Sequence, residues 1–262
     1  MTNAALHVAR SGLDAQNTKL QVIANNLANV NTTGFKKDRA NFETLAYQQL
    51  IAAGAASDSE NKFATGLSLG TGVALAGTSR IDTQGTLLNT GNTLDLAIEG
   101  GGYFQLQRPD GSIGYSRDGN FTRTAEGTLV NSDGLPLIPQ IQVPEGTASV
   151  TIGNDGTVSA MLSGSTTPTQ LGQIELANFA NPSGLQSVGG NVLLETAASG
   201  TPQVGLAGLD GRGTIRQGSL EGSNVNIVEE LVDMIETQRA YEVNSKMIKS
   251  TDEMLQYVNQ QL

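Results

Sequence analysis

Apolar residues recur every seven positions at both ends of this 262-residue chain. Near the N-terminus, four leucines have this spacing: Leu6, Leu13, Leu20 and Leu27. The second seam position of the same heptads holds Ala9, Gln16, Ile23 and Val30. An a/d pattern kept over more than three heptads is typical of a helix that packs against another helix. We predict such a helix here, followed by Gly34 as a residue able to take positive φ.

The C-terminus carries a second repeat of the same period: Ile227, Met234, Tyr241, Ile248, Leu255 and Leu262. Asn226, followed three residues later by Glu229, resembles a capping box and predicts the start of this helix. At 1.5 Å per residue, the C-terminal helix would be about 50 Å long and the N-terminal helix about 40 Å.

Each predicted helix has one narrow apolar stripe that must be covered. The two helices can pair with each other and with copies in neighbouring molecules, or form a two-helix hairpin packed on its own domain. Either helix alone would be marginal in water, because most helical stability comes from packing. Ends that become ordered only on assembly are compatible with this pattern.

The middle of the chain predicts β-structure. The β region extends from about Thr71 to Leu220. Within it, short segments such as residues 94–98 show a side-chain alternation with a period of two, and turns separate these segments. Five Asp-Gly pairs are expected to form hairpin turns, at positions 110–111, 118–119, 133–134, 155–156 and 210–211. Residues 36 to about 70 are small and polar without periodicity, which favours an extended loop or a long hairpin.

These patterns together predict an α+β fold. Long N- and C-terminal helices of the coiled-coil type would pack together, with an inserted all-β domain and an extended, hairpin-like stretch. The expected limits are 1–33 with 224–262 for the helical domain, 34–70 for the extended stretch and 71–223 for the all-β domain.

Composition excludes many kinds of function. The chain has no cysteine, one histidine and only 15% charged residues, so disulfides, thiolate metal sites and Ser-His catalysis are not expected. Its net charge of −10 argues against a nucleic-acid or anionic-membrane partner. The first residues lack the pattern of a cleavable secretory signal, and no apolar run is long enough to span a membrane.

Groups able to do chemistry are scattered along the sequence. We expect His7 to lie in solvent or at an interface. The glycine-rich segments 66–72 and 208–213 do not lie between a strand and a helix, and therefore indicate turns. Glu229, Asp233 and Glu236 are expected to form a solvated acidic face near the start of a helix. Three arginines are expected at the surface or at subunit contacts: Arg108, Arg117 and Arg123. We predict no catalytic, cofactor or metal site, and no enzymatic activity.

One stretch directly after the leucine heptads is specific. Residues 24–36, ANNLANVNTTGFK, resemble the signature A-N-N-x-A-N-x-x-T-x-G-F-K of bacterial flagellar rod and hook proteins. Residues 222–256 resemble the C-terminal helix of that family, and residues 97–111 with 115–121 resemble its β core. The chain length and the additional tract near 46–66 resemble the distal-rod branch.

The resemblance implies a location and a set of partners. Family members leave the cell through the flagellar type III export apparatus without a cleaved signal peptide, and form a rod that spans the periplasm in the basal body. The implied partners are further copies of the chain in a helical homopolymer, proximal rod proteins below, hook protein above and the surrounding ring proteins. The terminal helices would line an inner tube and the β domain would form its outer wall. No membrane insertion is implied.

The predicted subunit interface combines the heptad positions with the motif: Leu6, Leu13, Leu20, Ile23, Leu27, Asn25, Asn26, Asn29, Gly34, Phe35, Ile227, Met234, Tyr241, Ile248 and Leu255. The short amides are expected to bond backbone or neighbouring subunits. A proximal rod or hook paralogue is the alternative within the family. A cell-wall hydrolase and a β-rich binding module or adhesin are alternatives from other classes.

Overall fold

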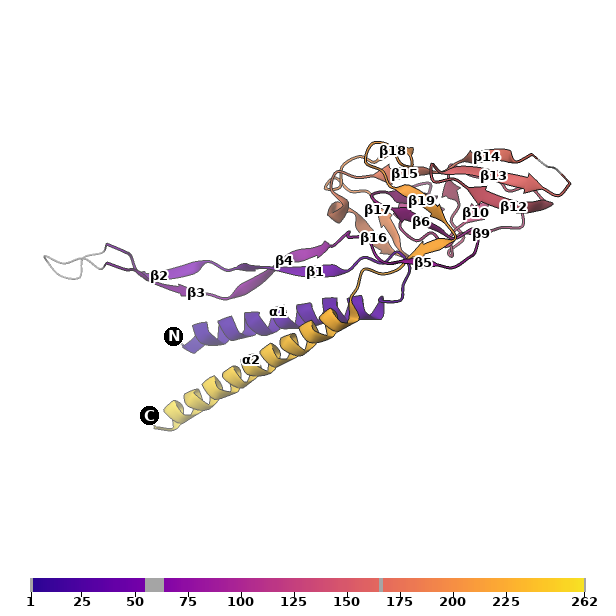
Figure 1. Ribbon diagram of the computed structural model, residues 1–262. Helices are drawn as coiled ribbons and strands as arrows, with labels where there is room; N and C mark the ends of the chain where they lie inside the picture. Colours follow the sequence, from indigo (N-terminus) through magenta and orange to yellow (C-terminus); the bar gives the residue numbers. More distant parts are fainter. Residues whose placement is uncertain (1, 55–63, 165–166, 262) are drawn as a thin grey trace. The chain divides into compact units, whose positions relative to one another are not determined.

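Two long helices form at the two ends of the chain, α1 (Thr2–Ala28) and α2 (Ile227–Gln261) (Figure 1). The computed structural model describes residues 2–54, 64–164 and 167–261. The fold is α+β, with a large β-rich middle between the helices. Asn226 caps α2 as predicted, because its Oδ1 accepts the backbone N–H of Val228 at 3.1 Å.

The chain divides into two compact units. The helical unit contains Met1–Leu27, Asp38–Ser79 and Asn226–Leu262, and the β unit contains Ala28–Lys37 and Arg80–Val225. Each unit therefore combines segments that are far apart in the sequence. The three-part division expected from the sequence stays a prediction about the assembled protein.

The two helices run antiparallel within the helical unit (Figure 1). Near one end, Asn26 Nδ2 donates to Glu230 Oε2 at 3.2 Å. Farther along, a Cβ added to Gly12 would lie 3.1 Å from Asn244 Nδ2. The two contacts are 14 residues apart on each helix, from 12 to 26 and from 230 to 244. The helices thus keep one register over two heptads.

A β-ladder completes the helical unit. Strand β1 (Asp38–Thr44) pairs with β4 (Val73–Arg80), and β2 (Tyr47–Ile51) pairs antiparallel with β3 (Leu67–Gly70). The stretch that we expected to be a loop or a hairpin is therefore a two-stranded ladder where it is described. Residues 55–63, inside the tract near 46–66, lie outside the described residues.

The β unit contains short strands, whose bounds are: β5 (Leu87–Asn89), β6 (Leu96–Glu99), β7 (Tyr103–Gln107), β8 (Ile113–Ser116), β9 (Thr122–Arg123), β10 (Leu129–Val130), β11 (Leu137–Ile138), β12 (Thr147–Ile152), β13 (Thr157–Leu162), β14 (Thr169–Gln173), β15 (Glu175–Asn178), β16 (Gln186–Gly189), β17 (Val192–Leu194), β18 (Gln203–Leu206), β19 (Thr214–Gln217) and β20 (Ser219–Glu221). A short 3₁₀ helix covers Pro182–Gly184. The largest sheet has the order β16-β17-β8-β7-β15-β18 with β11 beside β7, and β12-β13-β14 form a second sheet. The remaining strands pair as β19-β6, β20-β5 and β10-β9.

Four of the five Asp-Gly pairs lie at turns with a positive φ at glycine, namely Gly111, Gly134, Gly156 and Gly211. The hairpin turns predicted at Asp118-Gly119 and Asp210-Gly211 were wrong, because the flanking strands, β8 and β9 in the first case and β18 and β19 in the second, do not pair with each other. At Gly119 the chain instead passes close to the backbone of Leu96. A Cβ added there would lie 1.6 Å from the carbonyl oxygen of Leu96.

Apolar burial differs sharply between the two units. The β unit has an apolar core, in which the rings of Phe104 and Phe121 pack edge to face with their centroids 5.2 Å apart. Leu96, Ala97 and Ile98 are all fully buried, so this strand is covered on both faces although its sequence alternates. Among the described residues of the helical unit, the buried apolar side chains are Ala9 and Ile23. The helical unit has little core of its own.

Candidate assembly interface

Asn26 is the buried asparagine of the motif at residues 24–36. Its Oδ1 accepts the N–H of Asp38 at 3.0 Å, and its Nδ2 donates to the carbonyl oxygen of Asp38 at 2.9 Å and to Glu230. One amide thereby joins the end of α1 to the start of β1 and to α2. Asn25 is exposed and Asn29 is half-buried. Asn29 Oδ1 accepts the hydroxyl of Thr32 at 3.2 Å.

Gly34 continues the motif inside the β unit. Its φ is +68°, and its N–H donates to the carbonyl oxygen of Glu221 at 2.8 Å. A Cβ at this position would lie 2.6 Å from the backbone nitrogen of Asp118. Both the backbone conformation and the close approach therefore require glycine. Phe35, which follows, is half-buried.

Glu221 is the centre of a buried ionic cluster. Its Oε1 accepts Lys36 Nζ and the N–H of Gly85, the latter at 2.9 Å, and its Oε2 accepts Arg117 Nη1 at 3.3 Å. Both carboxylate oxygens of Glu221 therefore have hydrogen-bond partners, although the side chain is fully buried. Burial lowers the pKa of the Lys36 ammonium, and the hydrogen bond from Lys36 to Glu221 opposes that effect.

The surface position that we predicted for Arg117 was wrong. Arg117 is buried at 7% exposure, its Nη2 donates to the carbonyl oxygen of Gly100 at 2.8 Å, and its guanidinium lies 5.2 Å from the centre of the Tyr103 ring. A nearby carboxylate makes this burial tolerable. No local pattern in the sequence pairs Arg117 with Glu221, which lies 104 residues away.

Asn224 links the same motif to the segment that precedes α2. Its Oδ1 accepts the N–H of Lys37 at 2.7 Å, and its Nδ2 donates to the carbonyl oxygens of Ile81 and Thr83 at 2.8 and 3.1 Å. Asn224 therefore uses its amide as Asn26 does, to join two backbone segments. No pattern in the sequence marked Glu221 or Asn224 as a junction residue, although Asn224 lies in the segment that carried the family resemblance.

The seam of α2 against α1 is centred on a row three residues after the predicted row that begins at Ile227. Among the side chains of α2 that the structure describes, Glu230 and Thr237 are buried, at 5% and 2% exposure, and Asn244 is half-buried seven residues after Thr237. By contrast, Ile227 and Tyr241 remain 47% and 42% exposed. A polar row thus occupies the middle of the contact between the two helices.

Most of the other predicted heptad residues are half-buried. Those that are half-buried are Leu6, Leu13, Leu20, Leu27, Met234 and Ile248. Ile23 is buried. The side chain of Leu255 lies outside the described residues. Whether these residues meet a neighbouring subunit stays a prediction.

A second apolar face of α2 points away from α1. We call it the outward stripe, and its members are between 41% and 69% exposed: Val228, Leu231, Val232, Ile235, Val243, Met247, Met254 and Tyr257. Val232 lies two residues after the buried Glu230, and Ile235 lies two residues before the buried Thr237. At about 100° per residue, most of these side chains leave the helix on the side opposite the contact with α1, whereas Leu231 and Met247 leave it on the two flanks.

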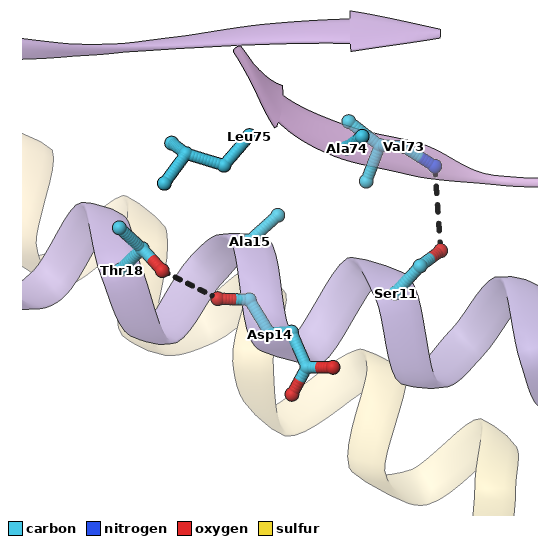
Figure 2. A pocket seen from close by; sticks show the side chains of 7 residues that line it. All are labelled: Ser11, Asp14, Ala15, Thr18, Val73, Ala74 and Leu75. Atoms are coloured by element: carbon cyan, nitrogen blue, oxygen red, sulfur yellow. Dashed lines mark hydrogen bonds between the residues drawn. The ribbon is translucent and has the colours of Figure 1, made fainter. Parts of the chain in front are cut away.

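A pocket lies between α1 and β4 within the helical unit (Figure 2). Its lining residues are Ser11, Asp14, Ala15, Thr18, Val73, Ala74 and Leu75. The hydroxyl of Ser11 donates to the carbonyl oxygen of Val8 at 2.8 Å and accepts the N–H of Val73 at 3.3 Å, which holds β4 against the helix. We call this feature the α1–β4 pocket.

The described ranges hold neither a metal-binding cluster nor a membrane-spanning helix. There, no group of three histidine or acidic side chains is arranged to hold a metal ion. In the same part of the chain, neither helix combines the length and the apolar character needed to cross a membrane. The features described in these ranges are an apolar stripe, a pocket and two polar junctions.

Three family descriptions match successive parts of the chain. Residues 6–36 match flagella basal body rod protein, residues 97–160 match the flagellar hook protein FlgE/F/G D1 domain, and residues 216–261 match the flagellar basal body rod FlgEFG protein C-terminal. The chain is 50% identical to the flagellar basal-body rod protein FlgG of Buchnera aphidicola subsp. Acyrthosiphon pisum, over 98% of both chains. It is 46% identical to the FlgG protein of Agrobacterium fabrum, over 98% of this chain and 99% of that one. The chain belongs to the flagellar basal-body rod protein family.

Within the rod family, one bacterium provides both a FlgG and a FlgF protein for comparison, and its FlgG protein is the more similar of the two to this chain. The FlgG protein of Caulobacter vibrioides is 44% identical over 98% of both chains, and its FlgF protein is 36% identical over 95% of this chain and 94% of that one. The rod-family matches include both polar junctions, with Asn26 and Lys36 in the first match and Glu221 and Asn224 in the third. The family is a structural one.

Proposed function

We propose that this protein is the subunit of the flagellar distal rod. It polymerises helically into the hollow shaft that crosses the periplasm and transmits torque from the motor to the hook. The observation that carries the proposal is the outward stripe of α2, a row of large apolar side chains left in water along a helix that already has a partner. Monomeric soluble proteins rarely expose a patch of this extent, and such patches mark interaction sites.

The weak core of the helical unit supports the same conclusion. Its buried apolar side chains, where described, are Ala9 and Ile23, and the seam between α1 and α2 is centred on Glu230, Thr237 and Asn244. Neighbouring copies would supply the missing apolar cover in a tube formed by the terminal helices, with the β unit as its outer wall. The half-buried heptad residues that we predicted as interface residues would then contact other copies.

The remaining partners follow from this role. Proximal rod proteins would lie below the polymer, hook protein above it and ring proteins around it, and the chain would pass through the type III export apparatus without a cleaved signal peptide. The tract 46–66 would bridge neighbouring subunits and stiffen the shaft. A shaft of unchanged rigidity after deletion of this tract would refute that part of the proposal.

Electron microscopy of basal bodies from a strain that lacks this gene tests the assignment. We expect a short proximal rod without a hook. A complete rod that lacks only the hook would assign the chain to the hook paralogue, and intact flagella would contradict any role in the rod. The higher identity to FlgG than to FlgF proteins favours the distal rod over a proximal paralogue.

An enzymatic role makes a different prediction. A cell-wall hydrolase would clear peptidoglycan in a gel overlaid with the purified protein. We expect no clearing, because torque is transmitted through subunit contacts and needs no acid-base pair. Clearing that disappears on substitution of an acidic residue would overturn the structural assignment.

A further inference from the structure

The chain passes between the helical unit and the β unit at four connections. These connections are the peptide bonds 27–28, 37–38, 79–80 and 225–226. A connection acts as a hinge when the few residues around it are free to change φ and ψ. The groups that hold the backbone next to these four bonds therefore decide how independently the two units can move.

The carboxamide of Asn26 holds the helical side of three connections. Asn26 lies just before bond 27–28, Asp38 follows bond 37–38 directly, and Glu230 lies in the first turn of α2, after bond 225–226. Nδ2 of Asn26 donates to the carbonyl oxygen of Asp38 and to Glu230, and Oδ1 accepts the N–H of Asp38. Asn26 is 2% exposed, so water competes little for these hydrogen bonds. We call these three residues the Asn26 clamp.

The carboxamide of Asn224 does the same on the β side. Asn224 lies just before bond 225–226, and its Oδ1 accepts the N–H of Lys37, the last residue before bond 37–38. Its Nδ2 donates to the carbonyl oxygens of Ile81 and Thr83, which follow bond 79–80. The N–H of Ile81 also donates to the carbonyl oxygen of Lys37 at 2.9 Å. We call these four residues the Asn224 clamp.

The two clamps hold consecutive residues of one connection. Asn224 binds the backbone of Lys37, and Asn26 binds both backbone polar groups of Asp38. All partners of each clamp lie within one unit, whereas the peptide bond between Lys37 and Asp38 joins the two units. A change of φ or ψ at either residue would therefore break hydrogen bonds in a clamp.

We propose that the Asn26 and Asn224 clamps act together to couple the two units across the Lys37–Asp38 bond. Both asparagines are positioning residues. This inference rests on the proposed function for its purpose, because a shaft transmits torque only if the two units of each subunit turn together. Neither clamp needs a neighbouring copy, so the coupling is a property of the single chain.

Limited proteolysis of the purified full chain tests the coupling. An endoproteinase that cuts before aspartate cleaves the Lys37–Asp38 bond only when the backbone on both sides of it opens, and its rate then follows the population of the open form. Asn26→Leu and Asn224→Leu should each raise the initial rate at this bond by at least about tenfold, because each variant leaves backbone groups without their partner. Since the clamps support each other, the double variant should fall clearly short of the product of the two single increases.

The same digest contains its own controls. Cleavage before Asp155 in the β unit and before Asp233 in α2, both exposed, reports any general loosening of each unit. Asn131→Leu is the matched variant, because Asn131 is also a buried asparagine, whose Oδ1 accepts the N–H groups of Asp133 and Leu135 in a turn of the β unit. It should leave the rate at the connection within about twofold of that of the natural chain.

A weaker change replaces Asn26→Leu if that variant speeds cleavage before Asp233 equally, which would mean that the helical unit has lost its fold. Glu230→Ala removes one of the three hydrogen bonds of the Asn26 clamp and keeps a good helix former in α2. It should enter the same cycle with Asn224→Leu and again fall short of the product.

The outcomes separate this inference from the proposed function. A double variant that reaches the full product, or a single clamp variant without effect at the Lys37–Asp38 bond, would overturn the coupling and leave the rod assignment intact. Intact flagella in a strain that lacks the gene would overturn the assignment, and a cycle that falls short of the product would still support the coupling.

Discussion

At the scale of single residues, two glycines allow the cost of backbone strain to be distinguished from the cost of a steric clash. Gly34 and Gly91 have nearly equal φ, +68° and +70°. A Cβ on Gly34 would meet backbone at 2.6 Å, but one on Gly91 would find nothing within 4 Å. Gly91→Ala should therefore lower the free energy of unfolding by about 1 kcal/mol, and Gly34→Ala by about 3 kcal/mol or more. Urea unfolding followed by circular dichroism measures both, and equal losses would show that contact with Asp118 is unimportant.

Asp118 makes stability depend on pH with a defined sign. Burial raises the pKa of its carboxyl above the ordinary 3.8, although the hydroxyl of Thr33 donates to it at 2.9 Å. The folded chain thus binds this proton more tightly than the unfolded chain. The stabilising contribution is complete below pH 3.8 and is lost as the pH rises through the folded pKa.

Asp118→Asn keeps an acceptor for Thr33 and removes the titration. The free energy of unfolding of this variant, relative to the natural chain, should rise from acid to neutral pH in urea titrations. Asp110 is the control, because hydrogen bonds from Ser112 lower the pKa of its carboxyl, and Asp110→Asn should show the opposite trend. Parallel curves for Asp118→Asn and the natural chain would contradict the assignment.

At the scale of elements, the Lys36–Glu221–Arg117 cluster joins the N-terminal motif to strand β20. Removing the acid leaves two buried cations, so Glu221→Gln should lower the free energy of unfolding by about 3–5 kcal/mol. Lys36→Met should cost less, because Arg117 still pairs with Glu221. In the double variant the losses should fall short of additivity by about 0.5–3 kcal/mol. Strict additivity in urea unfolding would show that Lys36 and Glu221 do not interact.

The two helices also show which parts of the fold could be predicted from the sequence. Heptad spacing correctly predicted two terminal helices, and Asn226 correctly predicted the start of α2. Spacing did not predict which face of α2 meets α1, because that choice depends on the partner. The buried amide of Asn26 selects Glu230, and this sets a polar row in the seam. Likewise, Glu221 and Arg117 become a pair only through long-range folding, which no local pattern records.

The two faces of α2 predict different phenotypes. Ile235 is 51% exposed and outside the seam, so Ile235→Asp should leave the circular dichroism spectrum of the monomer unchanged but prevent its incorporation into rods. Gln186→Asp adds the same charge at an exposed position of the β unit and should assemble normally. Incorporation measured in isolated basal bodies decides the matter. Equal behaviour of the two variants would mean that the outward stripe makes no subunit contact.

At the scale of the whole molecule, burial is unevenly divided. The β unit holds a continuous apolar core, whereas the helical unit, as far as it is described, buries only Ala9 and Ile23 among its apolar side chains. Local opening requires little free energy where few apolar contacts are broken. The monomer should therefore consist of a stable β unit joined to a helical unit that opens readily, and polymerisation should stabilise the second part selectively.

Hydrogen exchange followed by mass spectrometry tests this division. In the monomer, amides of α1 and α2 should exchange at least about a hundredfold faster than those of β7 and β15, because two helices without an apolar seam are marginal in water. In isolated rods, the helical amides should become as protected as the β core, since neighbouring copies then cover the outward stripe. Strands β7 and β15 serve as the internal control and should change little. Helices that are equally protected in both states would show that the helical unit is stable alone, and the outward stripe would then need another explanation.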